Sequence, residues 1–156
     1  MGPHPLPKRE EKKGEMKMQF FMAMQQPPTA THQEKAVRVV RTRTGQVRPQ
    51  VYEPERVAAA RAKLCAALSA HRPPHRLQGP LRLVVKWCFP RGKHPDGSWR
   101  TSRPDTDNLN KLLKDCMTAE GFWEDDAQVV SEVCEKFWAE VPGIWVRIDQ
   151  LGGGTI

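Results

Sequence analysis

The segment from Leu81 to Phe89 is the most strongly patterned part of this chain. Every second residue in it is apolar: Leu81, Leu83, Val85, Trp87 and Phe89. A period of two places all of these side chains on one face of an extended strand. The segment therefore predicts a strand with one buried face. The pattern does not indicate whether a helix or a second subunit covers that face.

Two other regions have a similar alternation. The first is residues 16–24, where Met16, Met18, Phe20, Met22 and Met24 share one face, and a run of methionines like this is typical of a core. The second is near the C-terminus, where residues 127–138 are rich in β-branched and aromatic residues and residues 144–148 alternate. Because Pro142 and Gly143 favour a turn between them, this region predicts an antiparallel hairpin.

Two segments predict helices. Pro54 suits the first turn of a helix, and the alanine-rich residues 55–70 follow it. In residues 109–119 the apolar side chains recur with helical spacing, and Gly121 supplies a C-terminal stop. The basic residues 35–48 predict a loop or a short hairpin that turns at Thr44 and Gly45.

The chain has 156 residues, 38% of them hydrophobic, which favours one folded domain. The elements predict an α+β fold in which a mixed sheet is flanked by two helices. We expect residues 16–150 to form the domain, residues 1–15 a flexible basic tail, and residues 151–156 a glycine-rich tail. The apolar runs are too short to cross a bilayer and no signal peptide opens the chain, so we expect a cytoplasmic protein without membrane partners.

The net charge of +7 and the pI near 9.5 favour a polyanionic partner, and nucleic acid is the first to consider. The four cysteines contain no C-x-x-C pair, so the sequence supports neither a disulfide framework nor a structural zinc site.

An acidic stretch follows the basic residues 91–103. Pro104 disfavours helical geometry at Arg103, and if the chain stays extended through Asp107, the side chains of Asp105 and Asp107 leave on the same face. Lys111 lies one helical turn after Asp107 and within its reach. The spacing therefore predicts two carboxylates and an ammonium group near the start of a helix.

After that helix, the chain reverses at Gly121 and a strand begins near Asp125 and Asp126. We expect this reversal to return a carboxylate toward the first pair. Carboxylates this close repel one another by about 4 kcal/mol per pair at an effective dielectric near 20, so they need a cation. Oxygen ligands suit Mg²⁺ or Mn²⁺, which supports hydrolysis of a phosphodiester. The alternative is a helix cap in a polar turn followed by an ordinary loop.

These residues resemble a known family. The similar stretch has no gap in its spacing and consists of residues 105–111 (Asp-Thr-Asp-Asn-Leu-Asn-Lys), Asp115, and residues 121–130 (Gly-Phe-Trp-Glu-Asp-Asp-Ala-Gln-Val-Val). It resembles the RusA family of Holliday-junction resolvases, which prophages often carry. A weaker similarity extends over residues 16–150.

The resemblance implies a set of site residues. Asp105, Asp107 and Asp126 would bind Mg²⁺, for which Mn²⁺ is a substitute, and Lys111 would be required for catalysis. No small-molecule cofactor is implied. Asp115 either supports Lys111 or forms a plain surface ion pair.

The resemblance also implies a homodimer that cuts opposed strands of four-way junction DNA symmetrically, in recombination and repair. The basic residues before the acidic stretch are candidates for contact with DNA phosphates: Arg91, Lys93, Arg100 and Arg103. Two alternatives remain open. One is a junction-binding accessory protein that has lost cleavage, and the other is a less selective metal-dependent nuclease.

Overall fold

The computed structural model describes residues 16–30 and 36–153, so the predicted N-terminal tail and part of the C-terminal tail lie outside the described residues. The described chain forms one α+β unit with a four-stranded sheet, two α-helices and a separate two-stranded hairpin. Within these residues, no helix combines the length and the apolar character needed to cross a membrane.

The main sheet is mixed, as predicted. Its strand order is β1 (Lys17–Ala23), β6 (Gly143–Gln150), β4 (Leu81–Pro90) and β5 (Val129–Ala139). β6 pairs antiparallel with both β1 and β4, whereas β5 pairs parallel with β4. The strongly patterned strand β4 is therefore an inner strand with a neighbour on each side.

The predicted C-terminal antiparallel hairpin is wrong. β5 and β6 follow each other in the chain but lie on opposite sides of β4. The helix between β4 and β5 supplies the long crossover that a parallel pair requires, so β5 takes one edge of β4. The turn near Gly143 still reverses the chain, but it carries the chain past β4 instead of closing a hairpin.

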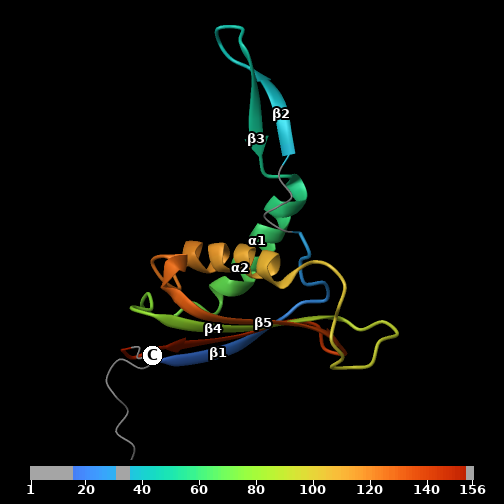
Figure 1. Ribbon diagram of the computed structural model, residues 1–156, viewed down its shortest axis with the longest axis vertical. Helices are drawn as coiled ribbons and strands as arrows, with labels where there is room; N and C mark the ends of the chain where they lie inside the picture. Colours follow the sequence, from blue (N-terminus) through green and yellow to red (C-terminus); the bar gives the residue numbers. More distant parts are fainter. Residues whose placement is uncertain (1–15, 31–35, 154–156) are drawn as a thin grey trace, which may run out of the picture.

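Both helices lie on the same side of the sheet (Figure 1). α1 (Glu55–Ser69) and α2 (Thr106–Ala119) contact each other and cover the apolar face of β4. The alternation predicted for β4 is confirmed, and its covering layer is helical. The buried residues of β4 are Leu81, Leu83, Val85, Trp87 and Phe89.

The basic segment forms a hairpin of β2 (Ala36–Arg41) and β3 (Val47–Tyr52). Of the two predicted alternatives, a loop or a short hairpin, the hairpin is confirmed. Its turn is closed by the Thr42 amide, which donates to the Gln46 carbonyl at 2.8 Å. Gly45 has a φ of 80°, a conformation that glycine adopts without strain. Figure 1 shows the hairpin projecting from the N-terminal end of α1, away from the sheet.

Candidate active site

Asp105 and Asp107 lie at the exposed start of α2. Asp105 is the N-cap residue, with extended backbone, and its side chain accepts no capping hydrogen bond; Asp107 lies in the first turn. The condition that the chain stays extended through Asp107 is therefore not met. Pro104 restricts only the residue before it, and the helix begins at Thr106. Negative charge is favourable at this helix end.

Lys111 is exposed on the next turn of α2, four residues after Asp107. Residues four apart are neighbours on a helix surface. The residues on either side of Lys111, Asn110 and Leu112, are buried. Asp105, Asp107 and Lys111 therefore all lie exposed at the start of α2, with Lys111 one turn after Asp107.

Asp126 lies at the other end of the same helix. Its Oδ1 accepts hydrogen bonds from the Thr118 hydroxyl and, at 3.2 Å, from Trp123 Nε1. Thr118 is the penultimate residue of α2, and a helix rises about 1.5 Å per residue, so about 20 Å of helix separates Asp126 from Asp105. The prediction that the chain reversal returns Asp126 to the first pair is wrong within a single chain.

The reason lies in the direction of β5. This strand begins beside the C-terminal end of α2 and runs back toward its start, so its middle residues, and not Asp126, approach Asp107. Consistent with this, no group of three or more His, Cys, Asp or Glu side chains suited to a metal ion occurs within residues 16–30 and 36–153.

A cleft of about 310 Å³ lies between α2 and β5. It is lined by Thr106, Asp107, Lys114, Glu132 and Cys134. The Glu132 carboxylate is held there by Lys114 Nζ at 2.9 Å and by Asn110 Nδ2 at 2.9 Å. Glu132 was not predicted from the sequence, and it places a second carboxylate in the cleft that Asp107 lines.

Cys134 contributes no reactive thiolate to this cleft. Burial raises the pKa of its thiol to about 12. The Sγ atom donates to the Thr106 carbonyl at 3.6 Å. The thiol is therefore protonated near neutral pH and is a poor nucleophile.

Lys136 fixes the backbone that leads into Asp105. Its Nζ donates to the carbonyls of Ser102 and Pro104, each at 2.8 Å. The Arg100 amide also donates to the Lys136 carbonyl at 3.0 Å. β5 therefore sets the position of the segment immediately before the site.

Two of the predicted DNA-contacting residues are engaged within the protein. Arg91 pairs with Glu140. The Arg100 guanidinium lies over the rings of Phe89 and Trp138, at 4.2 and 4.7 Å from their centroids, and burial lowers its pKa. The structure therefore gives Arg100 a role in packing the loop before α2.

The other two, Lys93 and Arg103, have exposed side chains that form no hydrogen bond or ion pair with the described residues. Trp99 is 62% exposed and stacks on Phe137 with ring centroids 4.6 Å apart. Trp123, by contrast, is fully buried and packs in the core.

Asn110 connects this site to the core. It is completely buried, and its Oδ1 accepts from Trp87 Nε1 at 2.9 Å while its Nδ2 donates to Glu132. The substitution Asn110→Leu keeps the size of the side chain but leaves the indole N–H of Trp87 unpaired. We expect the free energy of unfolding, measured with urea, to fall by about 2–3 kcal/mol.

The matched control is Asn108→Leu, on the same helix at a half-buried position. We expect it to change the free energy of unfolding by less than about 1 kcal/mol. Equal effects of the two substitutions would show that the Trp87–Asn110–Glu132 connection does not stabilise the fold.

The chain is similar to known proteins. The family described as "Endodeoxyribonuclease RusA" matches residues 9–149. The chain belongs to this family. A similar protein, the "Crossover junction endodeoxyribonuclease rusA" of Lactococcus phage r1t, is 33% identical over 139 residues, which cover 87% of this chain and 100% of the phage protein. "Uncharacterized protein YqaN" of Bacillus subtilis (strain 168) is 32% identical over 95 residues, which cover 53% of this chain and 66% of that protein.

RusA-family nucleases generally depend on a divalent metal, and the residues at the start of α2 fit such an ion. Asp105 and Asp107 are exposed, and the side chain of Asp105 is not consumed by capping. Carboxylate oxygens with open coordination positions are the donors that hard divalent cations prefer. This end of α2 is therefore the candidate active site of the RusA-family endonuclease.

Proposed function

We propose that this protein resolves Holliday junctions by paired symmetric cuts, with Mg²⁺ as its metal and Mn²⁺ as a substitute, in DNA recombination and repair. The observation that carries the proposal is the exposed pair of carboxylates with Lys111 at the start of α2, in a chain of this endonuclease family. The phage relative is named as a crossover junction endonuclease, which supports four-way junction DNA as the substrate.

Asp105 and Asp107 hold the metal in this proposal. A divalent ion bound there supplies charge stabilisation for the phosphate and lowers the pKa of a bound water. Lys111 places its ammonium one turn away, on the same exposed side, where it offsets the negative charge that develops on the scissile phosphate. Exposed Lys93 and Arg103 hold the DNA backbone near the site.

A homodimer is part of the proposal because of where Asp126 lies. In one chain it is at the far end of α2 from Asp105 and Asp107, so a site that uses all three carboxylates takes Asp126 from a second copy. A two-fold dimer contains two equivalent sites of this kind. Two such sites match the two opposed strands of a four-way junction.

The proposal is tested by cleavage of a labelled mobile four-way junction beside duplex and flap substrates, with and without Mg²⁺. We expect paired nicks at symmetric positions in the junction alone, and only with the metal. Equal cutting of all three substrates would instead establish a less selective nuclease. Tight junction binding without metal-dependent cutting would establish an accessory protein.

Lys136 gives a second prediction for this site. The substitution Lys136→Met removes both hydrogen bonds that hold the Ser102 and Pro104 carbonyls, so the chain before Asp105 is no longer fixed. Because small displacements of catalytic groups are costly, we expect the single-turnover cleavage rate to fall by about 10- to 100-fold. Junction affinity without metal should change little.

The matched control is Lys86→Met on β4, whose ammonium lies 5.0 Å from the centre of the Trp145 ring. We expect this variant to cleave at close to the rate of the unaltered protein. A wild-type rate for Lys136→Met would show that the Lys136 hydrogen bonds do not position the site.

A further inference from the structure

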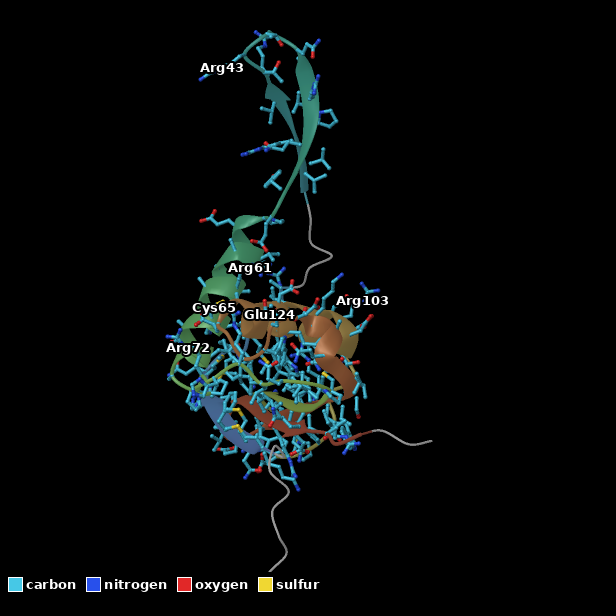
Figure 2. The ribbon with its side chains drawn as sticks, turned by 90° about the vertical axis from the view of Figure 1, so that its left-hand side faces the viewer. Arg43, Arg61, Cys65, Arg72, Arg103 and Glu124 are labelled. Atoms are coloured by element: carbon cyan, nitrogen blue, oxygen red, sulfur yellow. The ribbon has the colours of Figure 1, made fainter. Side chains whose placement is uncertain are left out.

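The β2–β3 hairpin stands apart from the rest of the protein. Its two strands pair with each other and with no strand of the main sheet. In Figure 1 it extends away from the sheet beyond α1, and in Figure 2 Arg43 lies at its tip, far from the body of the domain. An isolated two-stranded hairpin is only marginally stable in water, so a surface this long needs a binding partner to stabilise it.

The chemistry of the hairpin points to a polyanion. Between residues 36 and 52 the sequence contains no Asp or Glu. The same residues carry four exposed arginines: Arg38, Arg41, Arg43 and Arg48. Within the described part of the chain, none of these arginines forms an ion pair with a carboxylate. No carboxylate of residues 16–30 and 36–153 therefore offsets their charge.

Two of these arginines are held in place by uncharged neighbours. The Arg38 guanidinium lies 5.1 Å from the centre of the Tyr52 ring, and its Nε donates to Gln50 Oε1 at 3.1 Å. Arg48 donates to Gln46 Oε1 at 3.0 Å. Such contacts orient a guanidinium without neutralising it, which reduces the ordering cost of binding a phosphate.

One face of the hairpin is mostly apolar and exposed, with Arg41 at its end. Val37 pairs with Val51 and Val39 pairs with Pro49, so these side chains lie on one face. The three valines are 63–71% exposed. A two-stranded ribbon has the dimensions to enter the major groove of DNA, where apolar side chains contact thymine methyl groups. Docking on DNA therefore covers both faces.

We propose that the β2–β3 hairpin is a DNA-binding arm of the protein. Its four arginines bind the phosphates of a duplex segment of the substrate, at a distance from the cleavage site. This inference rests on the proposed function. The hairpin projects on the helical side of the sheet, the side on which α2 carries Asp105 and Asp107 (Figure 1). One DNA molecule lying over the helices therefore reaches both the arm and the site.

The test compares two variants of the full chain. In the first, all four arginines become glutamine: Arg38→Gln, Arg41→Gln, Arg43→Gln and Arg48→Gln. In the second, three valines of the same strands become threonine, which keeps every charge and the preference for strand: Val37→Thr, Val39→Thr and Val51→Thr. Affinity for a labelled junction and a labelled duplex is measured by fluorescence anisotropy without metal, over a range of salt concentrations.

We expect the arginine variant to bind both DNAs at least about tenfold more weakly near 0.1 M salt, because it has lost its phosphate contacts. Each lost contact also reduces the salt dependence of binding, so the slope of log affinity against log salt should become shallower by about 3–4. The threonine variant should keep the slope.

Unchanged affinity and an unchanged salt slope in the arginine variant would show that the hairpin does not bind DNA. Junction cleavage by the wild type would still support the proposed function. A loss of self-association in the threonine variant, with binding lost equally in both variants, would instead make the hairpin a contact between two copies. If the wild type fails to cut junctions but the arginine variant loses DNA affinity, the hairpin is a DNA-binding element and the proposed function is wrong.

Discussion

The substitution Asp107→Asn is expected to abolish junction cleavage while the protein still folds and binds junction DNA. Asparagine keeps the shape of the side chain at the first turn of α2 but removes the charge that holds the divalent ion in the proposed site. We expect the single-turnover cleavage rate with Mg²⁺ to fall by at least about 10³-fold, which corresponds to about 4 kcal/mol of transition-state stabilisation. Junction affinity, measured without metal, should stay within about twofold, since Asp107 itself repels phosphate.

The matched control for Asp107→Asn is Glu55→Gln, which removes an exposed acidic side chain from the first turn of the other helix, α1. Both substitutions remove one favourable charge from a helix N-terminus, so both should lower stability by a similar, small amount. Only Asp107→Asn should lose cleavage. Full cleavage activity in Asp107→Asn would exclude the start of α2 as the active site.

A second large effect is expected when two inactive variants are mixed. Asp126→Asn keeps an acceptor for Thr118 and Trp123, so the variant should fold, but its cleavage should be lost like that of Asp107→Asn. If each site takes Asp107 from one subunit and Asp126 from the other, a mixed dimer has one site with both substitutions and one site with neither. Mixing the two proteins should therefore restore cleavage.

Shared sites also predict how much cleavage returns and how many strands each mixed dimer cuts. With random exchange of subunits, half of the dimers are mixed and each has one intact site, so about a quarter of the wild-type sites return. A mixed dimer should nick one strand and leave its partner strand intact. No restored cleavage after verified subunit exchange would show that Asp126 does not complete a site on a second copy.

Local patterns predicted most of the elements of this fold. The alternation of β4, the helical spacing of residues 109–119 and the stop at Gly121 all report on which side chains a short segment buries, and the structure confirms them. Local patterns did not predict how the C-terminal strands pair. Residues 129–139 and 143–150 have the composition of strands in either arrangement, and only the position of β4 between them decides against a hairpin.

The candidate site was predictable in part. Asp105, Asp107 and Lys111 are close in sequence, so their spacing already placed them on neighbouring turns. The expected return of a carboxylate to the first pair fails because a helix of 14 residues carries the chain about 21 Å before it reverses. Glu132 and Lys136 gave no local signal, since charged residues at alternate positions of an edge strand are also typical of a solvated face.

Cutting of an extruded cruciform tests paired junction resolution. A supercoiled plasmid that extrudes a cruciform is incubated with the protein and Mg²⁺, and the products are separated on a gel. A resolvase with two sites cuts both opposed strands while it holds one junction, so we expect linear plasmid as the first product, with ends mapping symmetrically across the cruciform. An otherwise identical plasmid without the cruciform should stay supercoiled. Accumulation of nicked circles from both plasmids at equal rates would rule out paired resolution of junctions.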